Sequence, residues 1–124
     1  MQHPDLPIVD DGVLAELLSS TGDDPAFVRE LLETYLAETP EQLQAISDAI
    51  EADDAAALVR PAHTLKSSSA TLGAMRLSAL GRELEMAGRS GSLAPDLRET
   101  RDGAAETWAS TADALGAWLA EHAS

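Results

Sequence analysis

Apolar residues recur every three or four positions in the first half of the chain, as they do in amphipathic helices. One such stripe predicts a short helix over about residues 10–19, and a longer stripe predicts a second helix over about residues 25–51. Between them, Gly22 breaks the pattern, Asp24 is a suitable capping residue and Pro25 suits a first helical position. Pro40 interrupts the second stripe and predicts either a kink or two abutting helices.

The second half of the chain repeats this pattern three times. The apolar spacing predicts helices over about residues 53–72, 75–87 and 95–120, and Gly73 ends the first of these. Pro61 lies inside the same helix and lacks a backbone N–H. Either this helix kinks at Pro61 or it starts afresh near Arg60, and the sequence does not decide between the two.

The composition agrees with an all-helical protein. Alanine and leucine dominate, whereas the β-branched and aromatic residues that favour sheets are scarce. Short connections between four substantial amphipathic helices predict an antiparallel four-helix bundle, with the short N-terminal helix as a lid. The length of 124 residues suits a single domain over residues 1–124, with a core from about residue 8 to residue 120.

Charge, cysteine content and hydropathy narrow the class of function. The net charge of −14 argues against a nucleic-acid partner, because binding to phosphates needs a basic face. No apolar run is long enough to cross a bilayer, and the N-terminal residues lack the features of a signal peptide. The chain contains no cysteine. We therefore expect a cytoplasmic protein without a membrane or nucleic-acid partner.

The acidic residues are unevenly distributed. Residues 55–82 contain no Asp or Glu, so all 22 acidic side chains lie elsewhere in the chain. This acid-free window holds four cations, which are Arg60, Lys66, Arg76 and Arg82. It also surrounds His63, and we interpret the window as a region that handles an anion.

His63 is followed three residues later by Lys66, the only lysine in the chain. The predicted core stripe of this helix consists of Leu58, Ala62, Leu65, Ser69 and Leu72, and His63 lies about 140° from the centre of that stripe. His63 should therefore point to solvent, with Lys66 and Ser67 beside it. A neutral imidazole beside a fixed cation is suited to accepting a phosphoryl group.

The neighbours of His63 favour close approach by a partner. Small side chains flank it along the predicted exposed face, and Arg60 and Lys66 lie on either side of it. We predict that a partner's acidic site contacts this face through Arg60, Ser67, Ala70 and Ala74.

The run from Ala62 to Ala74, AHTLKSSSATLGA, followed by Leu80 and Leu84-Glu85, resembles the histidine phosphotransfer (HPt) family. The order of the helices is also similar, and the resemblance covers nearly the whole chain, from about Ile8 to Leu119. It implies that His63 is phosphorylated on Nε2 and that Lys66 steadies the phosphoryl group. Ser67 departs from the family pattern, which commonly has glycine there.

The resemblance also implies the partners. The phosphoryl group passes between His63 and an aspartate on the receiver domain of a response regulator, and a histidine kinase, which can be a hybrid kinase, is the other expected partner. The Mg²⁺ for this reaction belongs to the receiver, so no cofactor or metal is expected on this chain. The resemblance further implies a monomer that is not itself an enzyme and has no kinase or ATP-binding domain.

Three alternatives stay open at this stage. The chain could be a helical adaptor without phosphotransfer, or the phosphoacceptor fragment of a histidine kinase, although no Gly-rich nucleotide motif is present. A metal-binding bundle is the weakest alternative, because His3 and His122 are expected in frayed ends. Arg89, Arg98 and Arg101 fall outside the acid-free window and are interpreted as solvated charges. The role of Glu85, in packing or in pairing, rests on the resemblance alone.

Overall fold

The computed structural model describes residues 3–122, and this part of the chain is all helical, with no strand. Its helices are α1 (Asp11–Ser20), α2 (Pro25–Glu51), α3 (Ala55–Thr71), α4 (Met75–Ser90) and α5 (Leu97–Glu121). These bounds lie within a few residues of the sequence prediction. The predicted domain of residues 1–124 also includes four terminal residues that lie outside the described range.

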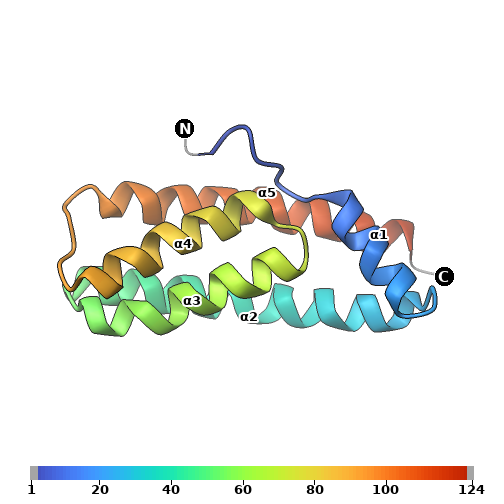
Figure 1. The fold of residues 1–124 in the computed structure, drawn as a ribbon, viewed down its shortest axis with the longest axis horizontal. Helices are drawn as coiled ribbons and strands as arrows, with labels where there is room; N and C mark the ends of the chain where they lie inside the picture. The colour runs from blue at the N-terminus through green and yellow to red at the C-terminus, as the bar shows by residue number, and fades with distance from the viewer. Residues whose placement is uncertain (1–2, 123–124) are drawn as a thin grey trace.

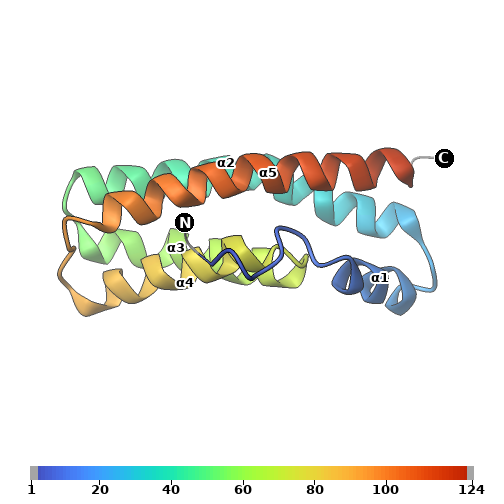
Figure 2. The same ribbon diagram turned by 90° about the horizontal axis from the view of Figure 1, so that it is seen from above.

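The four long helices run along the length of the molecule in two layers (Figures 1 and 2). Figure 2 shows α2 and α5 in one layer and α3 and α4 in the other. Each long helix packs against two others, with the most extensive packing between α3 and α4. The short helix α1 lies at one end, where it contacts α2.

Helix ends are set by capping aspartates and by glycines. Asp10, Asp24 and Asp54 each accept a hydrogen bond from a backbone N–H in the first turn of α1, α2 and α3. The predicted cap at Asp24, with Pro25 at the start of the helix, is confirmed. Gly73 ends α3 in a left-handed conformation with φ of 83°, which glycine adopts without strain.

The N-terminal segment is fastened to the turn between α3 and α4. Asp10 donates its backbone N–H to the carbonyl of Gly73 at 2.7 Å. The guanidinium of Arg76 donates to the backbone carbonyls of Leu6 and Pro4 at 3.0 Å each. Figure 2 shows this segment crossing α4 before α1 begins. Arg76, one of the four cations of the acid-free window, is therefore paired with the backbone of the N-terminal segment.

The core lies between the two layers and is built mainly from leucines. Fully buried side chains include Leu14, Leu32, Leu58, Leu65, Leu77, Leu80, Leu84 and Leu115. The predicted inner stripe of α3 is buried in full. One polar contact crosses this core, because the hydroxyl of Tyr35 lies 2.7 Å from Oγ of Ser69. The ring of Tyr35 also packs edge-on against Trp108, with the ring centroids 5.3 Å apart.

Both interior prolines lie inside continuous helices. Pro40 does not divide α2, and α3 begins at Ala55, so the alternative of a fresh start near Arg60 is wrong. Pro61 cannot donate to the carbonyl of Ala57. Ala57 is an exposed residue, so water can donate to that carbonyl instead. Pro61 itself is buried and adds apolar surface to the core.

Candidate functional site

The site forms where α3 and α4 pack closely against each other. Glycine at positions 81 and 88 of α4 makes this approach possible, because a Cβ on Gly81 would lie 2.9 Å from the backbone N of Lys66. A Cβ on Gly88 would likewise lie 2.9 Å from the carbonyl O of Ala55. Ser78 adds a link by donating its hydroxyl to the carbonyl of Lys66 at 2.9 Å. The face of α4 between these two glycines is thereby held against the helix that carries His63.

Glu85 occupies that face and pairs with three basic side chains. Its Oε2 lies 3.1 Å from Nδ1 of His63 and accepts from Nε of Arg89 at 2.9 Å. Its Oε1 lies 2.6 Å from Nζ of Lys66. The Glu85 side chain is only 6% exposed, so a charge there needs these partners. Glu85 therefore connects His63 to both neighbouring cations.

The cations keep Glu85 ionised. They lower the pKa of its carboxyl from 4.5 to about 2, with Lys66 the largest contributor and with Arg89 and His63 adding to it. Burial opposes this change, because desolvation disfavours a charged carboxylate, but the three basic side chains outweigh the effect of burial on the pKa. At neutral pH the carboxylate is consequently an acceptor only.

An acceptor at Nδ1 determines which nitrogen of His63 carries the proton. Because an ionised carboxylate cannot donate, the hydrogen bond must be Nδ1–H to Oε2 of Glu85. The lone pair of the neutral ring is then on Nε2, which has no protein partner within residues 3–122. The His63 side chain is 53% exposed, as the helical pattern predicts. The site therefore presents a fixed imidazole with its nucleophilic nitrogen open to solvent.

The predicted contact face is only partly as expected. Arg60, Ser67 and Ala70 are exposed on the same side of α3 as His63. The Ser67 hydroxyl makes no hydrogen bond within the described part of the chain, whereas its carbonyl accepts from Thr71. The prediction for Ala74 is wrong, because Ala74 is fully buried and precedes α4. The left-handed turn at Gly73 takes the chain off the line of α3, so the helical spacing does not extend that far.

The sequence pattern does not by itself place two residues, Arg89 and Glu85, in the site. Arg89 is expected to be a solvated charge but pairs with Glu85. Its position four residues after Glu85 on the same helix is a sequence signal for this pair. Glu85 itself could be placed near His63 only by the resemblance, because the contact depends on how α3 and α4 pack.

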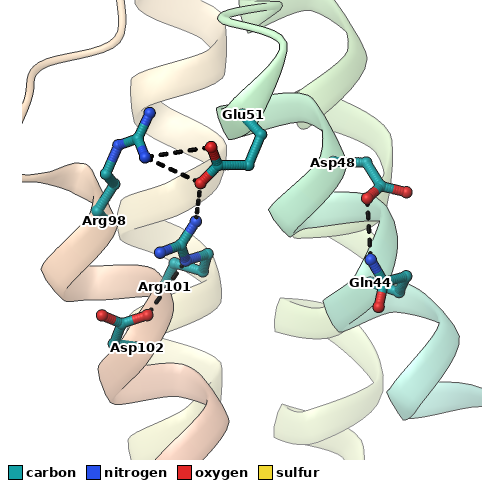
Figure 3. Close-up of polar contacts among 6 residues, drawn as sticks. All are labelled: Gln44, Asp48, Glu51, Arg98, Arg101 and Asp102. Atoms are coloured by element: carbon teal, nitrogen blue, oxygen red, sulfur yellow. Dashed lines mark hydrogen bonds and ion pairs between the residues drawn. The ribbon is translucent and has the colours of Figure 1, made fainter.

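Arg98, Arg101 and the two outer histidines lie in structural contacts. Arg98 and Arg101 pair with Glu51 at 2.9 and 2.6 Å, joining the start of α5 to the end of α2 (Figure 3). The two outer histidines, which are expected in frayed ends, both make side-chain contacts in the structure. His3 lies 3.0 Å from Glu83, and His122 stacks on Trp118 with ring centroids 3.9 Å apart.

Two searches of residues 3–122 bear on other kinds of site. No group of three or more His, Cys, Asp or Glu side chains in this range is arranged to hold a metal ion. Within the same range, no helix combines the length and the apolar character that a bilayer crossing requires.

Comparison with known proteins agrees with this geometry. The sequence model of the Hpt domain matches residues 30–121. The fold is similar to the crystal structure of histidine-containing phosphotransfer protein B (HptB) from Pseudomonas aeruginosa PAO1, with a TM-score of 0.83 and 29% sequence identity. That similarity covers 93% of this chain and 96% of the other. No curated protein sequence matches.

The family match spans well over half of the chain, so this protein belongs to the Hpt domain family. It is a histidine phosphotransfer protein of two-component phosphorelays. Members of this family carry phosphoryl groups and are not kinases, and their partners are response regulators and histidine kinases. Nothing in the fold or in the comparisons favours the adaptor alternative.

Proposed function

We propose that His63 is the phosphoacceptor of this protein and that Nε2 is the atom that receives the phosphoryl group. The observation that carries this proposal is the hydrogen bond between Nδ1 of His63 and the ionised Glu85. It leaves the lone pair on the exposed nitrogen and holds the ring in one orientation. The other two histidines are arranged differently, because His3 contacts the carboxylate of Glu83 through Nε2 itself and His122 contacts the backbone carbonyl of Trp118 through Nδ1.

In the transfer step, the Nε2 lone pair attacks the phosphorus of an aspartyl phosphate on a receiver domain. The P–O bond to the aspartate breaks, its electron pair stays with the carboxylate, and an N–P bond forms. The ring keeps its Nδ1 proton and becomes positively charged, which strengthens the hydrogen bond to Glu85. The reverse step passes the phosphoryl group on to the aspartate of another receiver.

Lys66 stabilises the charge on the transferring phosphoryl group. Its side chain is 32% exposed and lies one helical turn from His63, so its ammonium can move towards Nε2. Arg60, Ser67 and Ala70 then surround the docked receiver, and the short side chains of Ser67 and Ala70 let it approach the imidazole. We propose that the Mg²⁺ of the reaction is held by the receiver and that this chain needs no cofactor.

We further propose the finer architecture that suits this role. The four long helices act as one antiparallel bundle with α1 as a lid, in a monomeric protein of the cytoplasm without its own kinase or ATP-binding domain. Support for the bundle comes from the two layers of long helices joined by short loops at alternating ends (Figure 1). Size-exclusion chromatography with light scattering tests the monomer, since a dimer would double the mass.

The phosphoacceptor is tested by label transfer from a phosphorylated receiver domain. We expect acid-labile, base-stable label on the wild-type protein and none on His63→Gln. The matched control is the double variant His3→Gln/His122→Gln, which keeps only His63 and should accept label like the wild type. Label on His63→Gln at the wild-type level would overturn the proposal.

A further inference from the structure

Glu85 is paired unequally through its two oxygens. Oε1 has Lys66 as its partner at 2.6 Å, whereas Oε2 is shared between His63 and Arg89. Arg89 reaches Oε2 twice, through Nη2 at 2.8 Å and through Nε at 2.9 Å. The carboxylate therefore has one cation on each side, and only Lys66 lies on the helix of His63.

Phosphorylation places conflicting demands on Lys66. A phosphoryl group on Nε2 is a new anion near the ammonium, yet Lys66 is already bound to a buried carboxylate. A buried charge that loses its partner is strongly unfavourable, so Glu85 would retain Lys66 if it had no other cation. Arg89 is that other cation. Its planar guanidinium places two donors, Nε and Nη2, on Oε2, so Arg89 stays paired with Glu85 when Oε1 releases Lys66.

We propose that Arg89 is a positioning residue that keeps Glu85 compensated and in place, so that Lys66 can move from Glu85 to the phosphoryl group on His63. This inference rests on the proposed function of His63. The ring charge that develops on phosphorylation adds to the effect, because the imidazolium also compensates Glu85. Arg89 itself touches neither the phosphoryl group nor the reacting nitrogen; it acts through the carboxylate.

The position of Arg89 suits this role. It lies four residues after Glu85 on α4, so the pair is local and survives small shifts between α3 and α4. The Arg89 side chain is 61% exposed, so its removal leaves no cavity in the core. A loss of transfer in Arg89→Ala can therefore be separated from a loss of fold, with the helical circular dichroism signal as the check.

The test uses the full chain and the small phosphodonor phosphoramidate, so that receiver docking does not enter. The P–N bond of phosphoramidate breaks, ammonia leaves, and the N–P bond to His63 forms. We expect Arg89→Ala to lower the rate of His63 phosphorylation by about 10-fold. In a Glu85→Gln background the same substitution should have no further effect, because a neutral amide does not hold Lys66.

Arg82→Ala is the control for the loss of a positive charge from α4 that is not paired with Glu85. Arg82 is exposed and has no ion-pair partner within residues 3–122. The inference is overturned if Arg89→Ala is phosphorylated at the wild-type rate, or if Arg82→Ala slows the reaction as much. It is also overturned if Arg89→Ala slows the Glu85→Gln protein and the wild type equally. Failure of the wild type to be labelled at His63 would instead refute the proposed function.

Discussion

Oε2 of Glu85 lies 3.1 Å from Nδ1 of His63, although the two residues are 22 positions apart and belong to different helices. This contact exists because Gly81 and Gly88 let α4 approach the backbone of α3. It fixes the ring and its tautomer, and it connects the phosphoacceptor to two cations. The chemistry of the site therefore depends on helix packing as much as on the residues next to His63.

The pKa of Glu85 leads to a prediction about acid stability. Folding lowers the pKa from 4.5 to about 2, so the ionised carboxylate stabilises the fold fully above pH 4.5. This contribution is lost as the pH falls from 4.5 towards 2. We expect Glu85→Gln to lower the free energy of unfolding near neutral pH, with a difference from the wild type that shrinks in acid.

Urea unfolding followed by circular dichroism at about pH 7 and about pH 3 measures this difference. Glu33→Gln is the matched control, because Glu33 is an exposed residue of α2 without an ion-pair partner in the described range. The free energy of unfolding of Glu33→Gln should differ little from that of the wild type at both pH values. A Glu85→Gln difference that does not change with pH would contradict the assignment.

Lys66→Ala should slow phosphotransfer while the fold is retained. We expect a loss of at least about 10-fold in the rate of transfer from a phosphorylated receiver, because a cation beside the developing charge is removed. Arg98→Ala is the control, because it also removes a cation from an ion pair with a glutamate, but this pair, with Glu51, joins α5 to α2. Equal rates for Lys66→Ala and the wild type would remove Lys66 from the mechanism.

The glycine at position 81 should not tolerate a side chain. A Cβ there would lie 2.9 Å from the backbone N of Lys66, so Gly81→Ala must push α3 and α4 apart. We expect a loss of about 1–3 kcal/mol in the free energy of unfolding, together with slower phosphotransfer. Gly116→Ala is the opposite case, because nothing lies within 4 Å of a Cβ in that helical position.

Gly116→Ala should raise the free energy of unfolding by up to about 1 kcal/mol through helix propensity alone. Chemical unfolding of the two variants beside the wild type compares them directly. If Gly81→Ala were as stable as Gly116→Ala, the close approach of α3 and α4 would not be a requirement of the fold.

The helices were largely predictable because their signals are local. Capping aspartates, the glycine at position 73 and apolar spacing all act within a few residues, and the predicted inner face of α3 is buried. The exposure of His63 follows from the same spacing. Pro61 was ambiguous because a proline in a helix depends on whether water reaches the freed carbonyl, which is a tertiary property.

The site was less predictable than the fold because its main contacts cross between helices. The acid-free window of residues 55–82 groups Arg76 with the site, yet the Arg76 guanidinium binds backbone carbonyls of the N-terminal segment. The same window excludes Arg89, although Arg89 pairs with Glu85. Ala74 was misplaced because helical spacing was extended beyond the left-handed turn at Gly73.

The central claim is that Nε2 of His63 carries the phosphoryl group while Nδ1 stays protonated against Glu85. NMR of the phosphorylated protein, with its histidines labelled with ¹⁵N, tests it most directly through coupling between ³¹P and the ring nitrogens. The predicted result is one phosphorylated histidine, His63, with phosphorus coupled to Nε2 and a proton retained on Nδ1. Coupling at Nδ1, or a phosphoryl group on another residue, would contradict the account.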